Sequence, residues 1–243
     1  MESSTLDLFS LSVLFILGVA VPLLGIWDLR RLIRWVEEGR ADARLKTYHW
    51  LLVMEWGLTL GLLAWWLLAG RGIGALGLVS GYSGWAWLAL GLGLSATVFM
   101  MWQMSRVMKS PEDLQKLRDS MGNLEAIAPQ TPTEHRTFAF VSITAGVCEE
   151  IMYRGILMAV LTPVVGLWSA VAISSLVFGM GHIYQGFTGL VKTTLVGLVM
   201  ALLTVFSGSL LVAIVLHAVI DLTSGRMMGA ALTGPPANRP QTV

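Results

Sequence analysis

The sequence predicts an all-α membrane protein, a polytopic bundle of about seven or eight transmembrane helices. Of its 243 residues, 55% are hydrophobic and only 13% are charged. Soluble domains usually carry about 25% charged residues. Long apolar runs also recur along the whole chain. With a formal net charge of +1, nothing suggests a nucleic-acid partner, and the expected surroundings are a lipid bilayer.

Seven apolar runs approach the roughly 20 residues that a membrane-spanning helix needs. An eighth short or re-entrant helix is left open. The first run is expected to be retained rather than cleaved as a signal peptide, because the residues before it are acidic and no A-x-A pattern follows. The predicted spans are approximately Leu8–Trp27, Trp50–Leu68, Trp85–Met104, Thr137–Leu161, Val164–His182, Gly189–Phe206 and Ser209–Thr223.

The chain divides into three predicted regions. Residues 1–136 are expected to hold membrane helices, cytoplasmic loops and an amphipathic helix, residues 137–225 a polar core, and residues 226–243 a disordered tail. The amphipathic helix is predicted within "SPEDLQKLRDSMGNLEAI", where Ser110 is the N-cap and Pro111 the first helical residue. This helix is expected either to lie on the membrane surface or to cap the bundle.

Basic residues predict the orientation. The connection Asp28–His49 contains six Arg or Lys residues and Ser105–Arg136 contains five, whereas Gly70–Gly84 contains only Arg71. The positive-inside rule places the two basic connections in the cytoplasm. With seven spans, the N-terminus is then outside and the C-terminus cytoplasmic. We expect a multi-pass protein of the plasma (inner) membrane.

Ionisable residues occur inside the apolar C-terminal half. A charge at the bilayer centre costs on the order of 3 kcal/mol, so Glu149, Glu150, Arg154 and Asp221 should face one another or a polar intramembrane cavity. Glu150 and Arg154 are four residues apart, in the order that favours a salt bridge. Glu149 points about 100° away around the helix. It is therefore the carboxylate left free for chemistry.

Two further pairs share the four-residue spacing, namely Phe178 with His182 and His217 with Asp221. The alternative to a functional site is a buried polar cluster, in which these ionisable residues only fix the packing of the helices. Glu55 is expected near a membrane interface, where it either snorkels to the interface or has a structural role. For Glu149 and His182 to meet, the chain near Gly181–Gly189 must be irregular or leave its helix early, and it should line a cavity open to the cytoplasm.

Three motifs, "EEIMYRG", "FGMGH" and "HAVID", match in order the patterns E-E-x-x-x-R, F-x-x-x-H and H-x-x-x-N/D. Over about Phe138–Thr223 the chain thereby resembles the CPBP family of intramembrane proteases, which includes type II CAAX prenyl endopeptidases and Abi-type proteins. The resemblance implies a helical membrane fold with a polar cavity, and cleavage of a peptide bond. Residues 137–225 would then be the catalytic core.

The resemblance also implies roles for individual residues. Glu149 and His182 would activate the attacking water, and His217 and Asp221 would stabilise the oxyanion. Many relatives have asparagine at the last motif position, and an ionised aspartate cannot donate a hydrogen bond. We therefore favour Asp221 as the residue that orients His217. The supporting residues implied are Glu150, Arg154 and Phe178.

No cofactor is favoured, because H-E-x-x-H is absent. Zinc is the alternative, and its ligands would be Glu149, His182 and His217. The predicted substrate is a membrane-associated or lipidated peptide or protein. Two other functions are weighed against the protease: a non-catalytic membrane scaffold or immunity factor with the same fold, and a transporter. The transporter would predict symmetry between the halves, which the sequence does not show.

Overall fold

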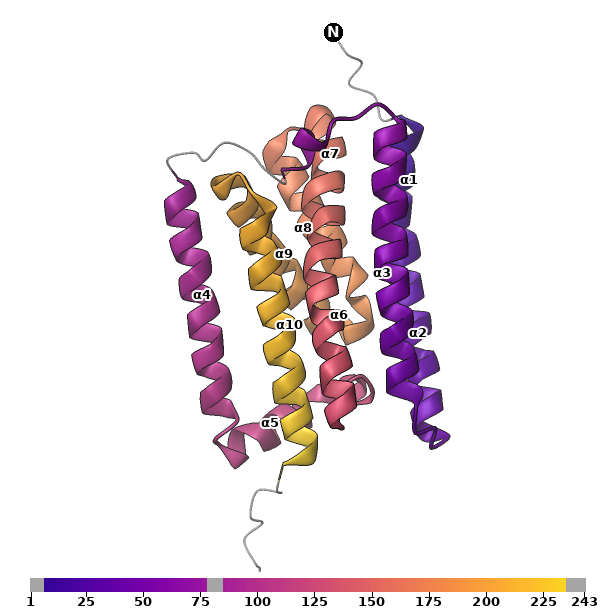
Figure 1. Ribbon diagram of the computed structural model, residues 1–243, viewed down its shortest axis with the longest axis vertical. Coiled ribbons are helices and arrows are strands. Elements are labelled where there is room, and N and C mark those ends of the chain that lie inside the picture. The colour runs from indigo at the N-terminus through magenta and orange to yellow at the C-terminus, as the bar shows by residue number, and fades with distance from the viewer. Residues whose placement is uncertain (1–6, 78–84, 235–243) are drawn as a thin grey trace, which may run out of the picture.

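The computed structural model describes residues 7–77 and 85–234. These residues form a bundle of helices, and no strand occurs among them. The long helices lie along the long axis of the molecule, and α5 lies across one end (Figure 1). The α-helices are α1 (Leu8–Phe15), α2 (Val21–Glu37), α3 (Ala43–Leu68), α4 (Ala86–Val107), α5 (Pro111–Met121), α6 (Pro132–Glu150), α7 (Met158–Val165), α8 (Leu167–Gly181), α9 (Gly186–Ser207) and α10 (Leu210–Thr233).

Each predicted span lies largely within helix, which confirms the helical membrane bundle. The first two helices are continuous through the π-helix η1 (Ile16–Ala20), and the described part of the chain has five helices long and apolar enough to cross a membrane. α8 is shorter, with 15 residues, and α6 carries charged residues near both ends. The total number of crossings therefore stays a prediction.

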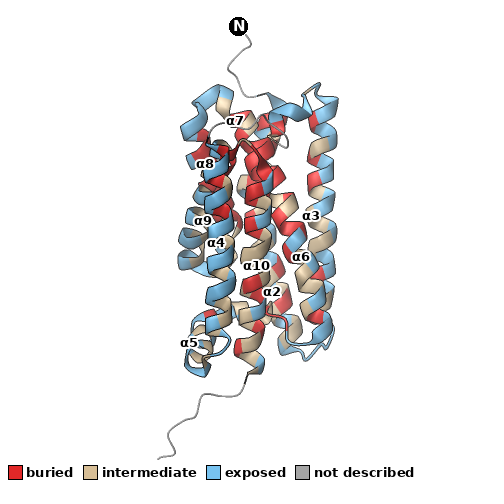
Figure 2. Cartoon of the chain, turned by 60° about the vertical axis from the view of Figure 1, so that its left-hand side comes forward, coloured by how far each residue is buried: buried red, intermediate tan, exposed pale blue. Residues whose placement is uncertain are grey.

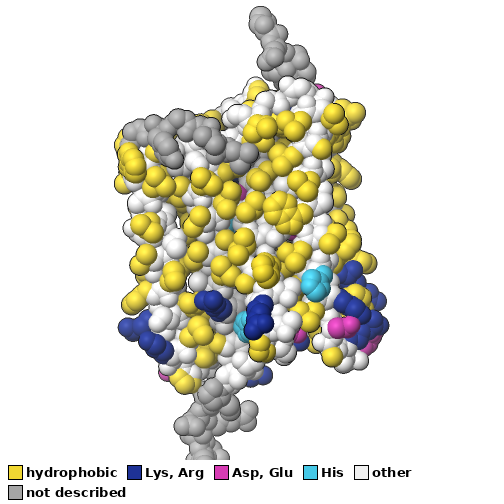
Figure 3. Space-filling model, in the orientation of Figure 1, with side chains coloured by type: hydrophobic (Ala, Val, Ile, Leu, Met, Phe, Trp, Pro, Cys, Tyr) yellow, Lys and Arg dark blue, Asp and Glu magenta, His cyan; other side chains and the backbone are white. Residues whose placement is uncertain are grey.

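The predicted basic connection Asp28–His49 is mostly helical, since α2 continues to Glu37 and α3 begins at Ala43. Arg31 stabilises this extension of α2. Its guanidinium pairs with Asp28 one turn earlier and lies over the rings of Trp27, Trp35 and Trp50. Such cation–π contacts let an arginine stay beside apolar surface. Lysine and arginine side chains gather at this end of the molecule, while the rest of the visible face is largely apolar (Figure 3).

α5 lies across one end of the bundle and packs on α10, the arrangement that the capping alternative for the amphipathic helix predicts. Its N-cap is Ser110, whose hydroxyl accepts a hydrogen bond from the backbone of Asp113 at 3.2 Å. The apolar face of α5 packs on the end of α10. Because of this contact α10 runs on to Thr233, so residues 226–233 are helical and their assignment to a disordered tail was wrong. Residues 235–243 of that tail lie outside the described part. The hydrophobic cluster between α5 and the end of α10 contains the buried residues Met121, Ala128 and Ala231, surrounded by Leu114, Leu117, Leu124, Met228 and Leu232.

The centre of the bundle is the contact between α6 and α10. At Gly146 the helices approach so closely that an added Cβ would lie 3.0 Å from the Cβ of Ala218. Close approach of this kind requires small residues. Buried residues gather where α6, α8 and α10 face one another, whereas the outer surfaces of α3 and α4 are exposed (Figure 2). The polar motifs of α6 and α10 are thereby brought face to face.

Candidate active site

The site begins where α6 changes its winding. Directly after Glu150 the chain continues as the π-helix η4 (Ile151–Leu157), and all seven of its residues are buried. π-Helical turns occur frequently at functional sites. Arg154 lies in η4, and its Nη1 donates to Oε1 of Glu150 at 2.9 Å, with both side chains fully buried. The predicted salt bridge is therefore present.

Arg154 is enclosed by two further groups. Its Nη2 donates to the carbonyl oxygen of Gly197 at 2.9 Å, and its guanidinium lies 4.2 Å from the ring centre of Phe178. A Cβ at Gly197 would lie only 2.9 Å from Nη2. Gly197 therefore makes room for the charge, a role that the sequence analysis missed. Nothing in the sequence distinguishes it from the other glycines of apolar spans.

His217 reaches the site from α10. Its Nδ1 is 2.8 Å from Oε1 of Glu150. When Nδ1 donates to this carboxylate, Nε2 is turned toward Glu149, whose Oε2 lies 3.9 Å away. Asp221 was expected to orient His217, but its Oδ2 is 3.7 Å from Nε2, longer than a hydrogen bond. Glu150, rather than Asp221, therefore orients the imidazole.

His182 follows the last residue of α8. Its Nδ1 is 3.0 Å from the carbonyl oxygen of Phe178. A carbonyl can only accept, so Nδ1 donates in this contact and Nε2 is the nitrogen turned toward Glu149. Nε2 lies 4.0 Å from Oε2 of Glu149. Three of the four side chains predicted to activate water or hold an oxyanion, Glu149, His182 and His217, thus converge from α6, the end of α8 and α10.

This convergence depends on the early end of α8. The helix stops at Gly181, a 3-10 turn η5 (Ile183–Gln185) follows, and α9 starts at Gly186. Gly186 has φ = 81°, a left-handed conformation that favours glycine. The predicted break in the helix between Gly181 and Gly189 is confirmed. This break allows the imidazole of His182 to lie 4.0 Å from the carboxylate of Glu149.

A cavity of about 500 Å³ contains these residues. Its polar end is lined by Glu149, His182, His217 and Asp221, and it extends to Leu117 and Met121 of α5. The cavity therefore runs from the carboxylates to the basic end of the bundle. Between these ends its wall is mainly apolar and includes Leu51, Met54, Phe138, Val141, Ile220 and Met227.

Glu55 is also in this wall. Glu55 was expected near an interface, but in the structure it lines the same cavity as Glu149. α3 packs along α6 and carries Glu55 into the site. The sequence contains a single acidic residue in this span, far from the motifs, and gives no signal of which face of the bundle it would occupy.

The residues considered for zinc do not form a metal site in this arrangement. Across residues 7–77 and 85–234, no three His, Cys, Asp or Glu side chains are grouped as metal ligands. Zinc bonds of about 2.0–2.2 Å would place tetrahedral ligand atoms about 3.4 Å apart. The nitrogens of His182 and His217 instead lie 4.0 and 3.9 Å from Oε2 of Glu149. We assign no step of the chemistry to a metal.

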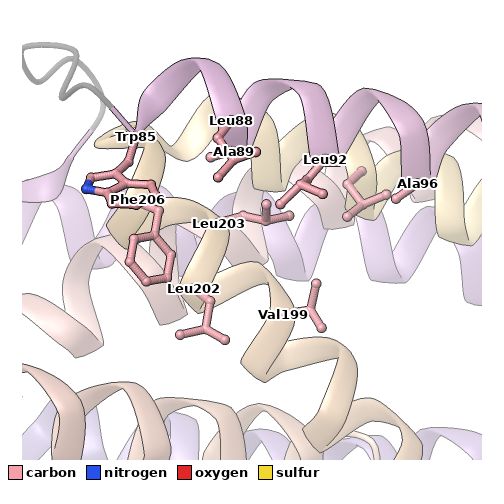
Figure 4. A pocket seen from close by; sticks show the side chains of 10 residues that line it. Trp85, Leu88, Ala89, Leu92, Ala96, Val199, Leu202, Leu203 and Phe206 are labelled. Carbon is pink, nitrogen blue, oxygen red and sulfur yellow. The ribbon is translucent and has the colours of Figure 1, made fainter.

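A second cavity, of about 620 Å³, lies between α4, α9 and α10. Its walls are apolar side chains, including Leu92, Val199 and Phe206, with Trp85 at one end (Figure 4). None of its lining residues is ionisable, so it has no part in acid–base chemistry. Leu216 lines it, directly before His217. We call this cavity the apolar groove.

Comparison with known proteins supports the sequence resemblance. The family model described as "Type II CAAX prenyl endopeptidase Rce1-like" matches residues 132–223. The match begins at the first residue of α6 and includes all the motif residues of the site. No curated protein and no solved structure matches the chain.

Proposed function

Because residues 132–223 match the family model of the Rce1-like type II CAAX prenyl endopeptidases, we propose that the chain is an intramembrane endopeptidase. It cleaves a peptide bond of a membrane-associated or lipidated peptide or protein. The observation that carries this proposal is the convergence of His182 and His217 on one oxygen of Glu149, at 4.0 and 3.9 Å. The match to a family of proteases and the helical membrane bundle both support an integral membrane protease.

Glu149 and His182 activate the attacking water. A water molecule held by hydrogen bonds of about 2.8 Å fits between atoms 4.0 Å apart. Nε2 of His182 accepts one hydrogen bond and orients the water, and Glu149 takes the other proton as general base. The water oxygen bonds to the carbonyl carbon. When the C–N bond breaks, Glu149 returns the proton to the leaving amine.

His217 stabilises the oxyanion. Its Nδ1 is committed to Glu150 at 2.8 Å, so Nε2 can donate only if the imidazole carries both protons. The carboxylates of Glu149, Glu150 and Asp221 surround the ring within 4 Å and balance that charge. A fixed cation at the developing negative charge lowers the barrier, because it needs no rearrangement during the reaction.

The basic end of the bundle faces the cytoplasm in this proposal, since Lys and Arg gather there (Figure 3). The cavity reaches this end beside α5. The substrate tail then enters from the cytoplasm, with the N-terminus of the enzyme outside and its C-terminus inside, in the plasma membrane. The apolar groove on the other side of α10 offers hydrocarbon surface to a lipid chain on the substrate.

The alternative is a non-catalytic scaffold with the same fold. Comparison of the membrane-associated peptides of cells making the native protein, Glu149→Gln or Glu125→Gln separates the two. Glu125 is exposed and is not among the residues that line the cavity, so its variant is a charge-matched control. A protease should yield cleavage products with native protein and Glu125→Gln that are lost in Glu149→Gln. Identical peptides in all three would favour the scaffold.

A further inference from the structure

We propose that Tyr153 is a further catalytic residue: its hydroxyl donates a hydrogen bond to the water molecule that Glu149 and His182 activate. The inference deepens the proposed function and rests on it. Tyr153 occupies one of the positions written x in the pattern E-E-x-x-x-R, so the motif assigns it no role.

Tyr153 follows Glu149 by one turn, on the same side of the chain. The two residues are four positions apart, and residues at this spacing are neighbours on a helix surface. Tyr153 belongs to the π-helix η4, which begins directly after α6. Both side chains line the polar cavity, so the change of winding keeps them on one face.

The hydroxyl of Tyr153 also lies beside the end of α8. A Cβ added to Gly181 would be 3.0 Å from this oxygen, and Gly181 directly precedes His182. The ring of Tyr153 packs edge-on against Phe178, with ring centres 5.2 Å apart. The ring of Phe178 in turn lies 4.8 Å from that of His182. Tyr153 is therefore held between the segment that carries Glu149 and the segment that carries His182.

This hydroxyl has no partner in the protein. Tyr153 is 2% exposed, yet within residues 7–77 and 85–234 its hydroxyl makes no hydrogen bond. Oε2 of Glu149 is likewise buried and without a hydrogen-bond partner in that part of the chain. Buried polar atoms are normally paired. A phenol can donate and a carboxylate can accept, so the two groups together suit a small polar molecule in the cavity.

A third hydrogen bond would fix the direction of attack. A water molecule has two protons and two lone pairs, and in the proposed mechanism its protons point to Glu149 and to Nε2 of His182. A hydrogen bond donated by Tyr153 occupies one lone pair and leaves the other to attack the carbonyl carbon. The phenol keeps its proton throughout. The proton taken by Glu149 still passes to the leaving amine, so the balance of the reaction is unchanged.

The test compares Tyr153→Phe, Tyr48→Phe and Glu149→Gln as full-length proteins in liposomes, with a peptide substrate identified from the membrane peptides. Tyr153→Phe removes one oxygen and keeps the ring. It should lower kcat by about 10- to 100-fold with KM unchanged, and the melting temperature should stay native because no protein hydrogen bond is lost. Tyr48→Phe is the matched control. Its hydroxyl donates to the carbonyl oxygen of Ile127 at 2.5 Å, so its loss should lower the melting temperature and leave kcat native.

The outcomes separate this role from the proposed function. Native kcat in Tyr153→Phe, while Glu149→Gln is inactive, would overturn the role of Tyr153 alone. A raised KM with native kcat would do the same, because the hydroxyl would then bind the substrate rather than the water. A fall in kcat together with a melting temperature lowered as in Tyr48→Phe would show a structural role and would also overturn it. Cleavage by Glu149→Gln would overturn the proposed function itself.

Discussion

Nδ1 of His217 on α10 lies 2.8 Å from Oε1 of Glu150 on α6, and the same oxygen lies 2.9 Å from Nη1 of Arg154. Glu150 thus joins the two helices and neutralises a fully buried arginine. Through His217 it also determines which imidazole nitrogen faces Glu149. The second glutamate of the "EE" pair therefore has a structural role that the first does not share.

Glu150→Gln should lower the level of folded protein, whereas Glu149→Gln should leave it nearly normal. The first change leaves Arg154 without its charge partner, at a cost of about 3–5 kcal/mol. The side chain of Glu149 has no arginine or lysine partner among the described ion pairs. Expression level and melting temperature of the two purified variants give the answer. Equal stability would contradict these separate roles.

Gly197→Ala should destabilise the protein and reduce cleavage. The added methyl group would lie 2.9 Å from Nη2 of Arg154 and 3.0 Å from the ring of Phe178, so the guanidinium must move from its buried partners. Gly61→Ala in α3 is the matched control, since nothing lies within 4 Å of its Cβ. A lower melting temperature in the first variant only is expected; equal melting temperatures would contradict this account of Gly197.

Asp221→Asn should retain cleavage, and Asp221→Ala should lower it. The side chain lines the cavity and lies 3.7 Å from Nε2 of His217, too far to orient the ring. Asparagine can donate a hydrogen bond to the oxyanion, whereas alanine offers neither charge nor donor. The measurement is kcat of both variants at fixed pH. Loss of activity in Asp221→Asn equal to that in Asp221→Ala would show that the charge is required.

Strong chelators should leave cleavage unchanged, because Glu149 and His182 activate water in the proposed mechanism. A zinc enzyme would lose activity and regain it on addition of metal. The assay is best done on washed protein with parallel elemental analysis. Stoichiometric zinc in active protein, together with loss on chelation, would transfer the role of Glu149 to metal binding.

Cysteines placed at Tyr184 or Gln185 should react with a water-soluble thiol reagent applied from the cytoplasmic side only. Both residues line the cavity that reaches the basic end of the bundle. The background is Cys148→Ala, which removes the buried native thiol. Val53, an exposed residue of α3 outside the cavity lining, provides a lipid-facing control. Labelling from the outside would show that the proposed orientation is inverted.

The sequence by itself determined the helical membrane fold, because long apolar runs can satisfy their backbone in lipid only as helices or closed barrels. It also determined the salt bridge between Glu150 and Arg154, since residues four apart share a helix face. The break after Gly181 followed from glycines beside a histidine that had to reach Glu149. These features depend on neighbours in the chain or on the requirements of the bilayer.

Only the tertiary structure decided the contacts between helices. The rotation of α10 against α6 brings His217 to Glu150, although the only helical spacing visible in the sequence was that of His217 with Asp221. The packing of α3 brings Glu55 into the cavity that Glu149 also lines, and that of α9 places Gly197 beside Arg154. In these nearly all-apolar helices many faces are equally able to meet lipid, so hydrophobic periodicity does not specify which side turns inward. Side-chain packing between helices makes that choice.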